Sequence, residues 1–168
     1  MFQVIFVVLA LVAASIHLAF SPASRSTRSA VAKTYLLYFL FIYVGLMGLL
    51  TAYAHVFRPL QTSASIGWVT SPYEYEVGMA DLTMGVLGIL CLWFRGNFWL
   101  ATAIGNGVWF LGDAIGHIRQ ITLNNNHAAN NSGIFLITEI ITPVVVLLLA
   151  LYVHVTRDGA SQKAFQRT

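Results

Sequence analysis

Charged residues are scarce in this sequence. Nine basic and six acidic residues make up only 9% of the 168 positions, whereas 58% are hydrophobic and the mean hydropathy is +0.75. A soluble globular domain carries about 25% charged residues. The composition therefore excludes a soluble enzyme, a nucleic-acid-binding protein and a disordered chain, and it indicates a single domain embedded in a lipid bilayer.

Cysteine is almost absent as well. Cys91 is the only one, so the chain has no internal disulfide and no cysteine-based zinc or iron–sulfur site. The sequence also lacks a nucleotide-binding motif, a haem attachment sequence, and a serine or cysteine nucleophile with a partnered base. The polar residues that remain for chemistry are histidines and carboxylates.

Long apolar segments dominate what is present. A helical span of the bilayer core needs about 20 apolar residues. Backbone polar groups in lipid must be satisfied within the protein, and none of the segments alternates like a barrel strand, so helices are expected. The first segment lacks the basic start of a signal peptide and is expected to be a true span. The predicted fold is an all-α bundle of five transmembrane helices, over about residues 2–20, 35–57, 73–94, 98–121 and 134–156, with a cytoplasmic tail over residues 157–168.

Basic residues indicate how this bundle is oriented. Only Arg58 and Arg119 fall on the side of the five-helix topology that contains the loops of about residues 58–72 and 124–133. Cytoplasmic loops carry an excess of Lys and Arg, so the N-terminus is expected outside and the C-terminus in the cytoplasm. The basic residues of the predicted cytoplasmic side are Arg25, Arg28, Lys33, Arg95, Arg157, Lys163 and Arg167.

Ionisable residues inside the predicted spans are the most informative feature, because such residues are costly in a membrane and usually functional. Six of them lie in the outer half of the bundle, on four of the predicted helices. A rise of 1.5 Å per residue places them in two layers, about 5 Å and about 9 to 12 Å below the outer helix ends. The upper layer contains His55, Glu76 and His117, and the lower layer contains Asp81, Asp113 and Glu139.

These residue types are those of a metal site. Asp113 and His117 are four residues apart and share one helix face. Two imidazoles with a carboxylate match the ligands of open zinc and non-haem iron sites. We predict that His55, Glu76, Asp113 and His117 bind a divalent metal ion, with Asp113 either a ligand or a group that orients the imidazole. Carboxylate-rich surroundings favour iron, zinc or manganese. The remaining acids, Asp81 and Glu139, are predicted to support the site or to form a proton path.

Two acids near the start of the third predicted helix cannot both point toward the same site. Glu76 and Asp81 are five residues apart and therefore point about 140° away from each other on a helix. We assign Glu76 to the site. The Ser-Pro-Tyr-Glu sequence at residues 71–74 is typical of a capping box, which explains Glu74 as a structural residue.

Glycines recur at spacings that allow close helix packing. Gly112 and Gly116 form a GxxxG pair, and Gly78, Gly85 and Gly88 lie on the preceding predicted helix. Small residues let helix backbones approach each other in a membrane. Packing within the bundle is the expected role, and contact with a second copy of the chain is the alternative.

The segments around these acids also resemble a known group of proteins. The stretches 76–82 (EVGMADL), 85–90 (GVLGIL) and 112–118 (GDAIGHI) are similar to those of small multi-helix bacterial inner-membrane proteins, which are loosely similar to the DoxX-like membrane families. The resemblance implies a multi-pass protein of the bacterial inner membrane. It implies no particular reaction.

Four interpretations of the acidic cluster follow. The first is a membrane metalloprotein, acting as an oxidoreductase or a hydrolase. The second is a proton- or cation-coupled transporter that uses Asp81, Asp113 and Glu139 as a relay. The third is a non-enzymatic subunit of a larger membrane complex, and the fourth is a set of protonated acids hydrogen-bonded between helices. The sequence does not decide whether the protein is an enzyme.

Overall fold

The computed structural model describes the backbone of residues 2–165 and the side chains of residues 2–156. Every regular element between residues 2 and 165 is a helix, which confirms the predicted all-α class. The π-helical segment η2 joins α2 to α3, and η1 is one short 3₁₀ helix. The elements are α1 (Phe2–Phe20), η1 (Pro22–Arg25), α2 (Arg28–Tyr38), η2 (Phe39–Leu46), α3 (Met47–Phe57), α4 (Pro59–Ile66), α5 (Tyr73–Leu90), α6 (Asn97–Asn124) and α7 (Ile134–Phe165).

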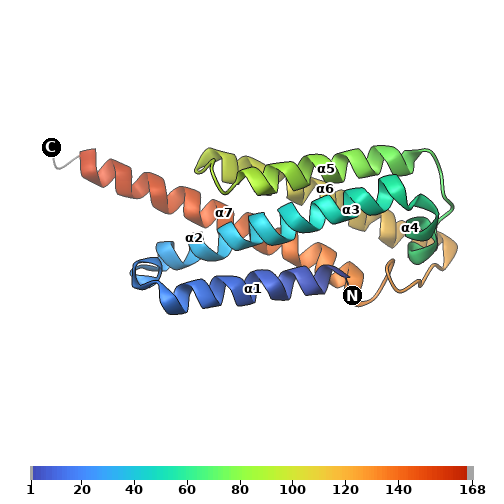
Figure 1. Ribbon diagram of the computed structural model, residues 1–168, viewed down its shortest axis with the longest axis horizontal. Coiled ribbons are helices and arrows are strands. Elements are labelled where there is room, and N and C mark those ends of the chain that lie inside the picture. Colours follow the sequence, from blue (N-terminus) through green and yellow to red (C-terminus); the bar gives the residue numbers. More distant parts are fainter. Residues whose placement is uncertain (1, 166–168) are drawn as a thin grey trace.

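The long helices run side by side along an elongated bundle (Figure 1). α2, η2 and α3 form one continuous rod, and α5 and α6 form a hairpin behind it. The start of α1, the short helix α4 and the segment between α6 and α7 lie at one end, which we call the loop end. The α1–α2 and α5–α6 connections lie at the opposite end, which we call the turn end.

Three helical stretches are long and apolar enough to cross a membrane, namely Phe2–Phe20, Arg28–Phe57 and Ile134–Thr156. α1 exposes large apolar side chains such as Ile5, Val8 and Ile16, which suit contact with lipid. α5 and α6 are not among the three stretches. The structure therefore indicates a membrane protein, and the five predicted spans remain a proposal.

Helix boundaries follow local signals that the predicted ranges only approximated. α2 begins at Arg28 rather than near residue 35, because the Thr27 side chain caps it by accepting a hydrogen bond from the Ala30 amide at 3.1 Å. α4 lies within the segment predicted as a loop; Pro59 occupies its first turn, and Gly67 ends it with a φ of 70°. α7 continues to Phe165, so the predicted tail is helical up to that residue. Residues 166–168 lie outside the described part.

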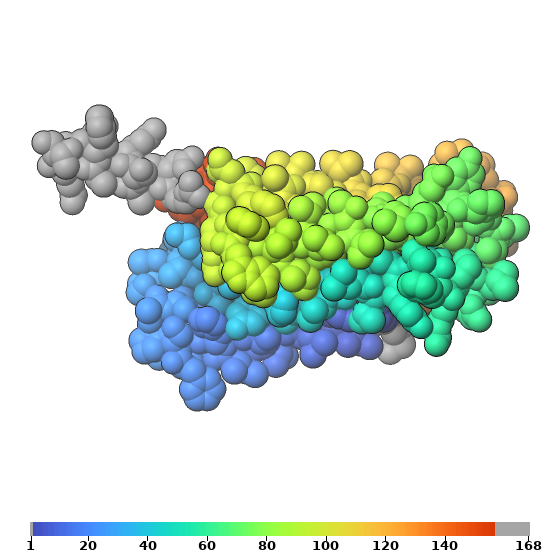
Figure 2. Space-filling model, turned by 45° about the horizontal axis from the view of Figure 1, so that its top comes forward, coloured from blue at the N-terminus to red at the C-terminus, as the bar shows by residue number. Residues whose placement is uncertain are grey.

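Close packing of α5 against the rod of η2 and α3 depends on glycine. Figure 2 shows α5 (yellow-green) lying directly against this rod (cyan). A Cβ atom at Gly88 would lie 2.4 Å from the Gly45 nitrogen, and one at Gly85 would lie 2.8 Å from the Leu49 nitrogen. The small residues predicted for packing on α5 therefore do pack within the bundle. Gly112 of the GxxxG pair does not, since a Cβ there would meet nothing within 4 Å.

The π-helical segment lies in the middle of the rod and places Tyr43 at its centre. π-helical turns are rare and occur frequently at functional sites. The Tyr43 side chain is fully buried, and its ring centroid lies 5.8 Å from that of Phe110 on α6. Through this contact, η2 packs the rod against α6.

The glycine contact predicts a large difference between two otherwise similar substitutions. Gly88→Ala would press a methyl group against backbone atoms, and we expect a loss of about 1–3 kcal/mol from overpacking. Gly112→Ala should be neutral or stabilise the protein by up to about 1 kcal/mol, because Ala is the better helix former. Thermal unfolding of both purified variants in detergent measures the difference. Equal melting temperatures would contradict the assigned packing.

Candidate metal centre

Three potential metal ligands meet where α6 packs against α7 near the loop end. Asp113 and His117 lie one turn apart on α6, and Glu139 lies on α7. One ligand atom from each residue lies within 4.8 Å of the other two. His117 is 3% exposed and Glu139 is 1% exposed, whereas Asp113 is only partly buried. One imidazole and two carboxylates therefore share a space large enough for a single ion.

Two loop residues fix the orientation and tautomer of His117. The Asn131 amide nitrogen donates to the backbone oxygens of Asn126 at 2.9 Å and His117 at 3.4 Å. Its Oδ1 accepts a hydrogen bond from Trp68 Nε1 at 2.8 Å and lies 2.8 Å from His117 Nδ1. Because Oδ1 can only accept, His117 Nδ1 must carry the proton, and the neutral imidazole presents its lone pair at Nε2.

The free nitrogen of His117 faces a carboxylate oxygen that has no partner. Nε2 lies 3.7 Å from Glu139 Oε2, which is too far for a direct hydrogen bond. Glu139 Oε2 is buried without a hydrogen bond, while Oε1 accepts one from Gln3 Nε2 at 3.4 Å. Metal bonds to imidazole nitrogen and carboxylate oxygen are about 2.0–2.2 Å long, so one ion can contact both atoms across this gap.

A second histidine–carboxylate pair lies between α3 and α5. His55 Nδ1 lies 2.7 Å from Glu74 Oε2, and His55 Nε2 lies 4.0 Å from Asp81 Oδ2. The Ser63 hydroxyl of α4 donates to the other oxygen of Glu74. Trp109 of α6 donates to Asp81 Oδ1 at 3.0 Å. The arrangement repeats that of His117, with one ring nitrogen held from the loop end and the other facing a buried carboxylate.

Besides Asp81, the acid of α5 that joins the cluster is Glu74 and not Glu76. Glu76 is exposed and takes part in none of the described hydrogen bonds or ion pairs. Two residues of separation turn side chains about 160° apart on a helix, so only one of the two acids can face α3. Side chains seven residues apart on a helix point in nearly the same direction. Glu74 and Asp81 have this spacing, which was the signal in the sequence that could have identified Glu74.

The capping-box prediction for residues 71–74 is wrong, because α5 has its N-cap at Pro72 and no side chain caps it. Ser71 Oγ accepts a hydrogen bond from the Tyr73 amide at 3.3 Å, close to the start of α5. The Glu74 side chain does not complete the box, because it binds His55 and Ser63. Glu74 is thus a residue of the cluster that sequence reasoning assigned to local structure.

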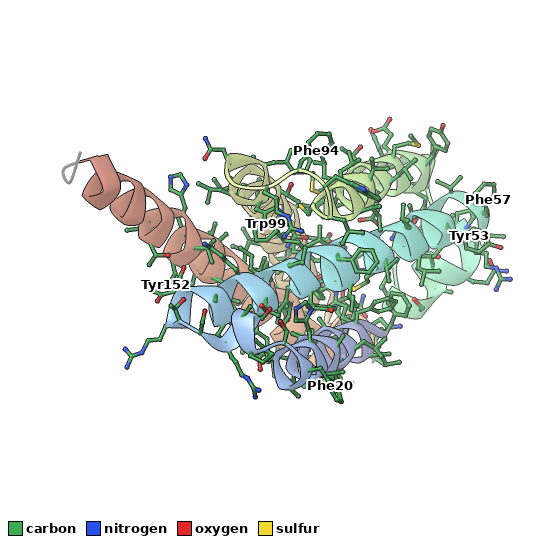
Figure 3. All side chains as sticks on the ribbon, turned by 60° about the vertical axis from the view of Figure 1, so that its left-hand side comes forward. Phe20, Tyr53, Phe57, Phe94, Trp99 and Tyr152 are labelled. Atoms are coloured by element: carbon green, nitrogen blue, oxygen red, sulfur yellow. The ribbon has the colours of Figure 1, made fainter. Side chains whose placement is uncertain are left out.

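Asp113 connects the two histidine–carboxylate pairs. It lies within electrostatic range of both His55 and His117, and Asp81 and Glu139 lie within range of Asp113. Among the side chains of residues 2–156, no Lys or Arg forms an ion pair with these acids. Arg58 lies instead over the Tyr53 ring, at 5.9 Å from its centroid, and Tyr53 projects from α3 in Figure 3. In the described part, the only basic groups that form ion pairs with these acids are therefore histidines.

The Asn131 network predicts a specific loss of stability. Asn131→Ala leaves the half-buried Trp68 N–H and the buried His117 ring without their acceptor, and an unsatisfied buried group costs about 1–3 kcal/mol. We expect a clearly lower melting temperature for this variant than for Asn124→Ala, whose exposed amide bonds only to Gln120. Thermal unfolding in detergent compares the two. A variant at position 131 as stable as the wild type would contradict the network.

Comparison with known proteins identifies a family and no activity. No curated protein and no solved structure matches the chain, and the resemblance to the DoxX-like families finds no support in these comparisons. The family model described as "Family of unknown function (DUF6790)" matches residues 1–159, which include every residue of the cluster. The chain therefore belongs to the DUF6790 family.

Proposed function

We propose that this protein is an integral membrane metalloprotein that binds a divalent ion between α6 and α7. The ligands are His117 Nε2, Glu139 and Asp113. The observation that carries the proposal is the pairing of His117 Nε2 with Glu139 Oε2, a buried atom without a hydrogen bond, across 3.7 Å. A buried polar atom without a partner is costly, and a cation between these two atoms satisfies both.

The ligand set favours iron, zinc or manganese, because imidazole and carboxylate together suit these ions. Three protein ligands leave a coordination position for water or substrate, which is typical of catalytic metal sites. An ion held in this way supplies Lewis-acid or redox chemistry, so a hydrolase or an oxidoreductase is the activity we propose. Asp113 is the least buried of the three ligands, and we place the open position on its side.

Metal analysis tests this proposal directly. Purified protein should contain iron, zinc or manganese in stoichiometric amount, and His117→Ala and Glu139→Gln should each lose it. Asn131→Ala should retain the metal with about 10–100-fold weaker affinity, since it removes only the group that orients the imidazole.

Two matched controls accompany this measurement. Glu76→Gln removes an exposed acid, and His127→Ala removes an exposed histidine that contacts only Asn125. Both should retain the full metal content. Wild-type protein without metal, or unchanged metal in His117→Ala, would refute the proposal.

We further propose that α1, the rod of α2, η2 and α3, and the helices α5, α6 and α7 all cross the bacterial inner membrane. In this orientation the N-terminus and the loop end lie outside. α5 and α6 lie alongside the three apolar stretches in the bundle (Figure 1), which supports their insertion. The turn end carries Arg25, Arg28 and Arg95 in its connections, as expected for a cytoplasmic surface. In this orientation the metal centre lies nearer to the outer surface.

Cysteine labelling in intact cells tests the orientation. Ser65→Cys lies on α4 at the loop end and Ser26→Cys in the α1–α2 connection, and both positions are exposed. A membrane-impermeant maleimide should label the first variant and leave the second unlabelled. The native Cys91 is fully buried and gives little background. The reverse labelling pattern would mean that the loop end faces the cytoplasm.

A further inference from the structure

The His55 pair has the geometry of a second metal position. Glu74 Oε2 lies 2.7 Å from His55 Nδ1, and Glu74 Oε1 accepts a hydrogen bond from the Ser63 hydroxyl. The Glu74 carboxylate thus acts as a hydrogen-bond acceptor. His55 Nδ1 therefore carries a proton, and Nε2, which presents a lone pair when the ring is neutral, lies 4.0 Å from Asp81 Oδ2. This gap is again too long for a hydrogen bond and short enough for one ion to contact both atoms.

Asp81 resembles Glu139 in its burial and in the oxygen that it turns toward a histidine, although the Asp81 carboxyl group also interacts with the Thr51 side chain. Trp109 occupies one of its oxygens, Oδ1, as Gln3 occupies one oxygen of Glu139. The remaining oxygen of each acid faces an imidazole nitrogen. The Asp81 side chain is 8% exposed, so its charge is nearly excluded from water. Two separate helices thus offer a buried carboxylate oxygen to a histidine that is fixed from the loop end.

Asp113 is the group that both positions share. It is within electrostatic range of His55 and His117, and none of the described hydrogen bonds or ion pairs engages its carboxyl group. A carboxylate has two oxygens and can offer one to each of two ions. Its electrostatic interaction with both histidines distinguishes Asp113 from Asp81, which pairs with His55, and from Glu139, which pairs with His117.

We infer that the cluster binds two divalent ions, the second between His55 Nε2 and Asp81 Oδ2, with Asp113 bridging both. The inference rests on the proposed function for the first ion. Two ions about 3.5–4 Å apart form a known class of catalytic centre that holds both the attacking and the leaving oxygen of a substrate. A dinuclear centre of this kind acts on esters, including phosphate esters, or on small oxygen-containing substrates held between the ions.

Charge supports two ions rather than one. Four carboxylates face the cluster when Glu74 is counted with Asp81, Asp113 and Glu139, and no described Lys or Arg is paired with them. One divalent ion neutralises half of the charge of four ionised carboxylates, and two neutralise all of it. Uncompensated charge is strongly unfavourable in the interior of a membrane protein, and two divalent ions supply full compensation when the four acids are ionised.

Manganese titration of the full-length, metal-free protein in detergent tests the inference. Calorimetry should give two Mn²⁺ per chain, and electron paramagnetic resonance of the loaded protein should show an exchange-coupled pair. His55→Ala should bind one Mn²⁺ and lose the coupled signal, and Asp113→Asn should weaken both binding events. Glu76→Gln should keep two ions and the coupled signal.

The possible outcomes separate this inference from the proposed function. One Mn²⁺ per wild-type chain, lost in His117→Ala and unchanged in His55→Ala, would overturn the second position and leave the first intact. No Mn²⁺ binding, together with no other metal in the purified protein, would overturn both. If His55→Ala does not fold, as judged by circular dichroism, Asp81→Asn tests the same position, and retention of two coupled ions in that variant would overturn the inference.

Discussion

Buried carboxylates in an apolar bundle are the constraint on which the rest of this structure depends. An ion in a low-dielectric interior carries a penalty of several kcal/mol unless it is paired and hydrogen-bonded. The described acids Asp81, Asp113 and Glu139 meet this requirement only in part, through Trp109, Gln3 and the two histidines. The incomplete pairing of Glu139 Oε2 distinguishes the cluster from a closed internal salt bridge and is the basis of the proposed metal site.

Segments at the loop end give the site its chemistry by fixing two rings. Asn131 and Trp68 hold His117, while Glu74 and Ser63 hold His55. Asn131 and Glu74 occupy Nδ1 of the two rings, and Nε2 of each ring faces a buried carboxylate. Outer hydrogen bonds of this kind orient metal-binding histidines in many proteins. The helices therefore supply the acids, and the loop end determines which nitrogen faces them.

Packing of the helix backbones sets the spacing of the two pairs. Gly45 and Gly88 allow η2 to lie in direct contact with α5, which brings the His55 and Asp81 side chains of the same two rods together. The π-helical segment changes the rotation of the rod in its middle, with the Met47 amide bonding to the Ile42 carbonyl five residues back. Its Tyr43 lies within electrostatic reach of Glu139.

The sequence by itself determined the helical class, the positions of the long helices and the half of the bundle that holds the ionisable residues, because hydropathy and helical rise are local properties. It also placed His55, Asp81, Asp113, His117 and Glu139 at depths where they could meet. Only the tertiary structure decided that Glu74 rather than Glu76 faces His55, and that Asn131 and Trp68 hold His117. Those choices depend on how each helix is rotated and where the loops return, and packing between distant segments sets both.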